Sequence, residues 1–146
     1  AGSTTWRTLD AGLRADYWVR AMALSSPAFS LADDARKLFG SVDEIPEQYF
    51  HLLMNVGRNY FASVYDFDPI DAAKSYPGDV LIFHGDRDTL VPIDYSRRAA
   101  ESFPNAMLQV LSGEGHMYSG QAVRQTIDSI SDFFYTHLEK AVMPQS

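Results

Sequence analysis

The sequence predicts an α/β fold, in which a parallel β-sheet carries helices on its faces. Two short apolar runs, Val80–Phe83 and Met107–Leu111, are bounded by turn residues and are typical of strands buried on both faces. Between them, Asp94–Phe103 has apolar residues at a spacing of four, which predicts a helix. A strand, a helix and a strand in this order form the unit from which parallel sheets are built.

Periodicity and capping residues predict the other elements. A further strand is expected over Asp16–Ser25, ended by the Ser26-Pro27 pair. Ser30 is the expected N-cap of one helix, and Asp68 caps a short helix that has Pro69 at its first position. Helices are expected over these segments: Trp6–Leu13, Leu31–Phe39, Glu47–Tyr60, Pro69–Lys74 and Ser119–Leu138.

Length and composition exclude several classes of protein. The 146 residues suffice for one domain with a core, and 46% of them are apolar, which excludes whole-chain disorder. The net charge of −7, from 12 basic and 19 acidic residues, argues against a nucleic-acid partner, which needs a basic face. No apolar run approaches the roughly 18 residues of a membrane span, so no membrane contact is expected.

Two further absences bear on chemistry and compartment. The chain has no cysteine, which excludes disulfides and thiolate nucleophiles. No apolar N-terminal segment with a basic flank is visible, so no signal peptide is expected and the predicted location is cytoplasmic.

Polar groups gather where the two apolar strands end. His84-Gly85-Asp86-Arg87-Asp88 follows the first run, and Gly113-Glu114-Gly115-His116 follows the second. The carboxyl ends of parallel strands are where open α/β sheets bind ligands. Asp88 is therefore expected within hydrogen-bonding reach of His116, 28 residues further along. A carboxylate that orients an imidazole makes two thirds of an acyl-transfer triad, with His116 as general base.

Other roles for these side chains stay open at this point. Asp86 competes with Asp88 for the role of the acid, and His116 has the alternative of being a loop histidine without a function. His84 is interpreted as a structural residue whose ring bonds the loop backbone. These groups match no metal-ligand spacing, so neither a metal ion nor another cofactor is expected.

Together these motifs resemble a known family. The order of strand, His84–Asp88, Val91-Pro92, helix, strand and Gly115-His116 is similar to the C-terminal half of the α/β-hydrolase fold. In that family the acid follows the seventh strand and the histidine follows the eighth. The resemblance therefore implies a partial α/β-hydrolase fold with about three parallel strands, and it assigns the acid to Asp88 and the base to His116.

The N-terminal part of the chain points to one branch of this family. Ser26-Pro27-Ala28-Phe29, followed by Asp33-Asp34-Ala35, resembles the cinnamoyl and feruloyl esterases. The resemblance implies a helical cap, or lid, at about residues 29–76 of a single 1–146 unit. The aromatic side chains of this segment either form the core of the cap or line an apolar slot for an aryl acyl group. They are Phe29, Phe39, Tyr49, Phe50, Tyr60, Phe61, Tyr65 and Phe67.

The third member of the triad is not found in this sequence. A serine nucleophile needs a strained strand-to-helix turn with the pattern Gly-x-Ser-x-Gly, and no such pattern occurs here. The family would place this turn close to Ala1, so the nucleophile and the oxyanion hole are expected on a segment other than these residues. Ser3 is considered as a relic of that turn. The other serines considered are strand-end or cap residues without an elbow: Ser25, Ser26, Ser112 and Ser119.

Two classes of function follow. In the first, the chain supplies the acid and the histidine of a serine esterase whose substrate is a small-molecule carboxylic ester. A peptidase or an acyltransferase of the same fold is the alternative within this class. In the second, the chain is a non-catalytic module that pairs with a missing N-terminal half, or with itself, through an exposed sheet edge. The first class predicts that this polypeptide alone does not hydrolyse esters.

Overall fold

A three-stranded parallel sheet forms the centre of the molecule, as the sequence predicts. The computed structural model describes residues 19–51 and 54–142. The strands are β1 (Ala21–Ser25), β4 (Asp79–Gly85) and β5 (Asn105–Leu111), in the order β1-β4-β5. Each strand runs parallel to its neighbour, so the carboxyl ends of all three lie at one edge of the sheet.

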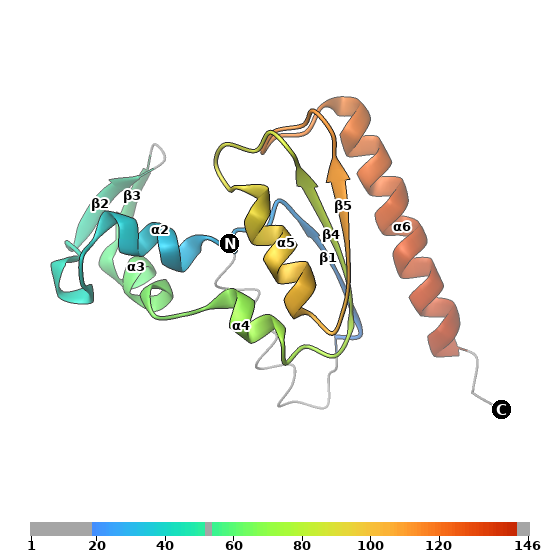
Figure 1. Cartoon of the computed structure of the whole chain (residues 1–146), viewed down its shortest axis with the longest axis horizontal. Helices are drawn as coiled ribbons and strands as arrows, with labels where there is room; N and C mark the ends of the chain where they lie inside the picture. Colours follow the sequence, from blue (N-terminus) through green and yellow to red (C-terminus); the bar gives the residue numbers. More distant parts are fainter. Residues whose placement is uncertain (1–18, 52–53, 143–146) are drawn as a thin grey trace.

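Helices cover both faces of this sheet (Figure 1). Helix α5 (Ile93–Ser102) connects β4 to β5 and lies on one face beside α4 (Pro69–Ala73). Helix α6 (Gly120–Val142) follows β5 and lies along the other face, where it contacts β1 and β4. The three layers are those of an α/β fold.

The main core lies between the sheet and α5. Val80 and Ile82 of β4 pack there with Ala99 and Phe103. Alternate residues of a strand point to opposite faces, so Leu81, which lies between Val80 and Ile82, faces α6. It is just as deeply buried. Burial on both faces explains why β4 is a continuous apolar run.

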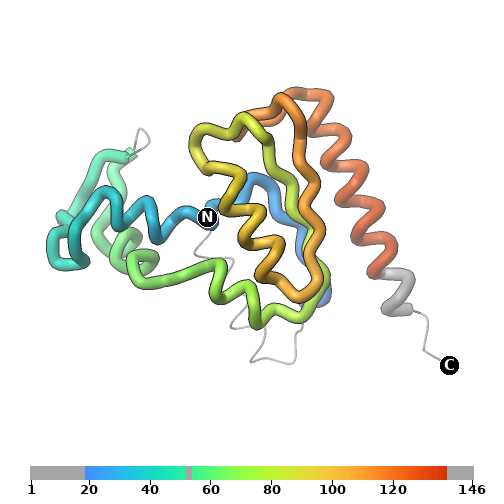
Figure 2. Tube along the Cα trace, viewed as in Figure 1, coloured from blue at the N-terminus to red at the C-terminus, as the bar shows by residue number. Residues whose placement is uncertain are grey.

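Most of the segment between β1 and β4, apart from α4, forms an inserted subdomain that projects away from the sheet (Figure 1, Figure 2). It contains α2 (Leu31–Leu38), the 3-10 turn η1 (Val42–Glu44), the antiparallel hairpin of β2 (Gln48–His51) and β3 (Met54–Gly57), and α3 (Arg58–Tyr65). A second core lies inside it and consists of Ala35, Phe39, Ile45, Phe61 and Val64. Several of its aromatic residues therefore form a core of their own.

The structure corrects one predicted element of this subdomain. The sequence predicts a helix over Glu47–Tyr60, but the β2–β3 hairpin occupies most of this segment. Two of the apolar residues that suggest a helical stripe do not face inwards, because Phe50 is 65% exposed and Met54 is 60% exposed. Tyr49 and His51 point to the aromatic core instead, and their spacing of two residues is that of a strand.

The two predicted helix caps have different outcomes. The Asp68 carboxylate accepts hydrogen bonds from the backbone N–H groups of Ile70 at 2.9 Å and Asp71 at 3.2 Å, so the predicted cap of α4 is confirmed. Ser30 precedes α2, but its hydroxyl makes no capping bond to the helix. It donates instead to the Asp34 carboxylate at 2.6 Å, one turn further along.

The other predicted elements are found, with their ends shifted by a few residues. Strand β1 begins at Ala21, five residues after the predicted start, and α6 extends to Val142. The predicted helix over Trp6–Leu13 and residues 16–18 of the predicted strand lie outside the described residues. No helix in the described part of the chain is long and apolar enough to cross a membrane.

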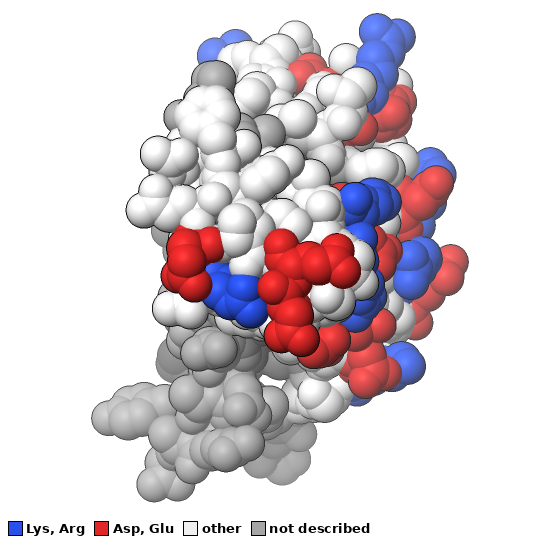
Figure 3. All heavy atoms as spheres, turned by 90° about the vertical axis from the view of Figure 1, so that its left-hand side faces the viewer, with Lys and Arg blue, Asp and Glu red and all other residues white. Residues whose placement is uncertain are grey.

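Charged side chains of both signs share the face that carries the inserted subdomain (Figure 3). On this face Lys and Arg lie among Asp and Glu, and an area of other residues lies beside them. Ion pairs within α2 follow this pattern, with Arg36 at 3.4 Å from Asp33 and Lys37 at 3.3 Å from Asp34. The basic residues described on this face therefore form no patch of their own.

Candidate active site

Asp88 and His116 meet at the carboxyl ends of β4 and β5. Oδ2 of Asp88 accepts a hydrogen bond from Nδ1 of His116 at 2.8 Å. The contact arises because β4 and β5 pair in parallel, which brings the two loops that leave them to the same edge. The contact expected from the sequence is present, and the catalytic role of the pair stays a prediction.

The Asp88 carboxylate is held by its own loop. Its Oδ1 atom accepts the backbone N–H groups of Leu90 and Val91, both at 2.9 Å, and the side chain is fully buried. Burial raises the pKa of this carboxyl, but the hydrogen bonds from Val91, His116 and Leu90 outweigh it, so the pKa of Asp88 lies below its ordinary value. Asp88 is therefore a carboxylate at neutral pH, the state that orients an imidazole.

A buried histidine, His84, lies against the same carboxylate. Its Nε2 atom is 3.1 Å from Oδ2 of Asp88 and 2.8 Å from the carbonyl oxygen of Val91. A carbonyl oxygen only accepts, so Nε2 carries the proton, and Nδ1 accepts from the hydroxyl of Ser96 at 2.7 Å. The interpretation of His84 as a structural residue that bonds the loop backbone is confirmed. Its contacts with Asp88 and Ser96 are not foreseen from the sequence.

Asp86, the competing acid, joins the two loops and does not contact the histidine. Its Oδ1 atom accepts the backbone N–H of Gly113 at 2.7 Å, and the N–H of Arg87 donates to the carbonyl of Glu114 at 2.9 Å. The loops approach closely at Gly85, where a Cβ atom would collide with the carbonyl oxygen of Glu114. These contacts hold the loop of His116 against the end of β4.

Tyr118 connects the same loop to the ends of β1 and β4. Its hydroxyl donates to the carbonyl oxygen of Phe83 at 3.1 Å and accepts from the hydroxyl of Ser26 at 2.8 Å. Ser26 has a φ of 41°, in the left-handed region that residues other than glycine rarely adopt. Its N–H also donates to the Phe83 carbonyl, at 2.9 Å. Tyr118 therefore positions a segment two residues from His116, and no local sequence pattern marks it.

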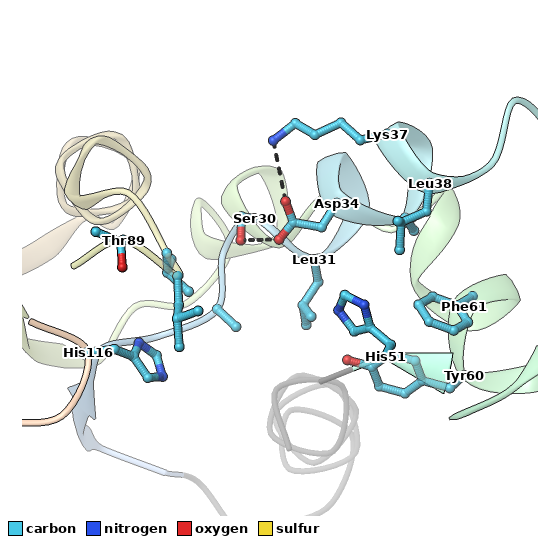
Figure 4. Close-up of a pocket in the computed structure, with 14 residues that line it drawn as sticks. Ser30, Leu31, Asp34, Lys37, Leu38, His51, Tyr60, Phe61, Thr89 and His116 are labelled. Carbon is cyan, nitrogen blue, oxygen red and sulfur yellow. Dashed lines mark hydrogen bonds and ion pairs between the residues drawn. The ribbon is translucent and has the colours of Figure 1, made fainter. Parts of the chain in front are cut away.

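An apolar cavity of about 480 Å³ opens beside His116 (Figure 4). Leu90 and Val91, from the loop after β4, form one wall, and Leu31 and Phe61 of the inserted subdomain form another. Pockets for small organic ligands have volumes of roughly 300–1,000 Å³ and mostly apolar walls. The inserted subdomain therefore lines a cavity beside His116, in addition to enclosing its own core.

Among the described residues, none of the serines considered from the sequence makes a hydrogen bond to His116. Ser3 lies outside the described residues. Ser119 precedes α6, where its hydroxyl donates to the Glu114 carboxylate at 2.6 Å and accepts from the N–H of Ala122 at 3.3 Å. In residues 19–51 and 54–142 no group of three or more His, Cys, Asp and Glu side chains is arranged to hold a metal ion.

Comparison with known proteins defines the class of fold. No family model and no curated protein matches the sequence. Solved structures of α/β-hydrolases superpose on 90% to 95% of the chain, which therefore has the α/β-hydrolase fold over the part that they match. One of them is Est1E from Butyrivibrio proteoclasticus, with ferulic acid bound. It has a TM-score of 0.78 and 24% identity over 95% of this chain and 57% of that chain.

Two other structures show the same relationship. Mouse α/β hydrolase domain-containing protein 10 has a TM-score of 0.69 and 16% identity, over 90% of this chain and 58% of that chain. A meta-cleavage product hydrolase from Pseudomonas fluorescens has a TM-score of 0.58 and 21% identity, over 94% and 62%. The chain thus spans about three fifths of the length of these proteins. The predicted partial α/β-hydrolase fold is confirmed.

Proposed function

We propose that this chain supplies the acid and the base of a serine esterase. The observation that carries the proposal is the 2.8 Å hydrogen bond between Oδ2 of Asp88 and Nδ1 of His116. It leaves Nε2 of the histidine without a hydrogen-bond partner among the described residues, while the ring lines the apolar cavity. A fold shared with hydrolases and esterases supports the same class of reaction.

The reaction proposed for this pair is ester hydrolysis in two stages. A serine hydroxyl, brought by a Gly-x-Ser-x-Gly segment outside these 146 residues, gives its proton to Nε2 of His116 while its oxygen bonds to the ester carbonyl carbon. Asp88 stabilises the resulting imidazolium. The proton then passes to the leaving alcohol as the carbon–oxygen bond breaks, and water repeats both steps to release the acid and restore the serine.

The acyl group proposed for the substrate is aryl, as in hydroxycinnamate esters. The walls contributed by Leu31, Phe61 and Leu90 are apolar, and a volume of about 480 Å³ accommodates an aromatic ring with a short linker. The bound ferulic acid described for Est1E, whose fold is similar, supports the same acyl class.

This function is tested by assaying ester hydrolysis with a longer polypeptide, which also contains the residues encoded directly upstream of Ala1. The 146-residue chain alone is expected to leave an aryl ester intact, and the longer polypeptide is expected to hydrolyse it. His116→Ala and Asp88→Ala should each abolish this hydrolysis. An extended polypeptide that has no Gly-x-Ser-x-Gly segment and no turnover would contradict the proposal, as would hydrolysis that survives in His116→Ala. Assays with amide substrates and with acceptor alcohols distinguish a peptidase or an acyltransferase.

A second candidate function, an association module without catalysis, is favoured by the outer surface of α6. Val123, Ile127 and Phe134 are exposed along this helix, and Met107 is exposed on β5. A contiguous row of exposed apolar side chains on one helix is a candidate contact surface. This candidate does not explain why a buried carboxylate orients a histidine at the rim of a cavity, so esterase is the preferred function.

A further inference from the structure

The far end of the cavity carries polar groups that the proposed reaction does not use. His116 lies at one end, whereas His51 and Tyr60 lie at the other, with Leu31 between them (Figure 4). An imidazole and a phenol thus face a cavity whose walls are otherwise mostly apolar. A ligand that extends from His116 along these walls would bring its far end to His51.

The other polar groups of this wall are engaged with one another. Oδ2 of Asp34 accepts from the hydroxyl of Ser30 at 2.6 Å, and Oδ1 accepts from Nζ of Lys37 at 3.3 Å. Lys37 is also largely exposed to solvent. These three side chains are therefore satisfied without a ligand.

His51 differs from them because its ring is packed while its nitrogens are not bonded. The ring centroid lies 6.0 Å from that of Phe61, with the planes at 75°, and 6.2 Å from that of Tyr49. These contacts fix the ring at the end of β2. Among the described residues neither nitrogen of His51 has a hydrogen-bond partner. A neutral imidazole offers one donor and one acceptor, so His51 has both available to a ligand in the cavity.

We propose that His51 determines which acyl group the cavity accepts, by a hydrogen bond to a hydroxyl group at the end of the aryl ring remote from the ester. The inference rests on the proposed function, because it places the ester carbonyl at His116. The aryl ring then lies along Leu31 and Leu90, and the unprotonated nitrogen of His51 accepts a hydrogen bond from the phenolic hydroxyl. An acyl group without this hydroxyl fills the same space but leaves the imidazole unbonded.

Binding of two matched esters to the 146-residue chain tests the inference. Methyl 4-hydroxycinnamate and methyl cinnamate differ by a single hydroxyl, and isothermal titration calorimetry gives the affinity of each. The wild-type chain should bind the hydroxylated ester about threefold to tenfold more tightly, which is the size of one neutral hydrogen bond. His51→Phe keeps an aromatic ring against Phe61 and should bind the two esters equally. His51→Gln restores a hydrogen-bonding group and should recover part of the preference.

Tyr60 provides the comparison that separates His51 from its polar neighbour. Tyr60→Phe should retain the preference for the hydroxylated ester. The inference is overturned if the wild type binds the two esters equally or binds neither. It is also overturned if the preference survives in His51→Phe, or if Tyr60→Phe alone abolishes it. Binding needs no nucleophile. A preference that depends on His51, found together with no ester hydrolysis by the longer polypeptide that includes the residues preceding Ala1, would therefore count against the proposed reaction and not against this inference.

Discussion

Asp88 is the residue on which the site depends most, because its two oxygen atoms serve different partners. Oδ1 is held by the backbone N–H groups of Leu90 and Val91, and Oδ2 accepts from His116 with His84 at 3.1 Å. The loop thus fixes the carboxylate, and the carboxylate fixes the imidazole. A substitution that keeps the hydrogen bonds from the loop to residue 88 but removes the one from His116 separates these two roles.

Asp88→Asn makes this separation. The amide oxygen still accepts from the loop, but an NH₂ group then faces His116, so the free energy of unfolding at about pH 7 should fall by about 1–3 kcal/mol. The folded-state pKa of Asp88 lies below its unfolded value. The stability contributed by the carboxylate is therefore present above the unfolded pKa and is lost as pH falls through the folded pKa. Urea unfolding should show the difference in stability between the two proteins shrinking as pH falls below about 4, the ordinary pKa of an aspartate.

Asp86→Asn is the matched control for this experiment. Asp86 is exposed, and an asparagine oxygen can still accept from the N–H of Gly113. Its effect on the free energy of unfolding should stay within about 0.5 kcal/mol. Equal losses in Asp86→Asn and Asp88→Asn would show that the buried carboxylate has no special role in the fold.

Tyr118→Phe tests whether the loop of His116 is positioned from the ends of β1 and β4. The change removes only the hydroxyl that joins Ser26 to the carbonyl of Phe83, so unfolding free energy should fall by about 1 kcal/mol. The Nδ1 proton of His116 should also exchange faster with water, as measured by NMR. Tyr135→Phe, on an exposed part of α6, should change neither quantity. An unchanged His116 signal in Tyr118→Phe would contradict the positioning role.

At the level of elements, the sequence predicts correctly those helices and strands whose apolar residues fit only one type of secondary structure. Strand β4 is apolar throughout and is buried on both faces, so its pattern admits one interpretation. The β2–β3 hairpin has exposed Phe50 and Met54 alternating with inward residues, and a short apolar segment of this kind also fits a helix. The missed hairpin is therefore a consequence of apolar residues on its outer face.

The site shows the same division between what topology determines and what side chains determine. The meeting of Asp88 with His116 follows from parallel pairing, because both residues leave adjacent strands at one edge. The bond between Ser26 and Tyr118 joins residues 92 positions apart and leaves no local trace. His51 reaches the cavity because it lies in the β2–β3 hairpin. The helix predicted for this segment therefore gives no indication that His51 lines the cavity.

The close approach of the two loops gives a prediction at this scale. Gly85→Ala puts a Cβ against backbone oxygen atoms of Glu114 and Gly115, which cannot move without displacing the loop of His116. The unfolding free energy should fall by about 2 kcal/mol or more, as for other overpacked backbone contacts. Gly115→Ala is the control, because its Cβ would meet only the carbonyl of Arg87 at 3.8 Å, an ordinary contact. Equal stability of the two variants, measured by urea unfolding, would contradict the close approach.

The whole molecule leaves apolar surface uncovered along α6. Ala122 and Thr126 face the sheet and are buried, but Ile127 is 55% exposed and Val123 and Phe134 are also exposed on the next stripe of the helix. Among the described strands β1 pairs on one side only, with β4. An exposed apolar stripe and an unpaired strand edge each favour association with another polypeptide.

The 146-residue chain alone should therefore self-associate, with an average mass by light scattering that rises above the monomer value as concentration increases. The double variant Ile127→Lys, Phe134→Lys places charges on the exposed stripe and should shift the chain towards the monomer. Its far-UV circular dichroism and its Asp88–His116 hydrogen bond should be unchanged, since Ile127 and Phe134 are exposed on α6 and neither lines the cavity beside His116. The double variant Gln121→Lys, Gln125→Lys adds the same two charges at exposed polar positions of α6 and controls for charge alone. A wild-type chain that stays monomeric up to millimolar concentration would show that α6 needs no cover, and would remove the main support for an association module.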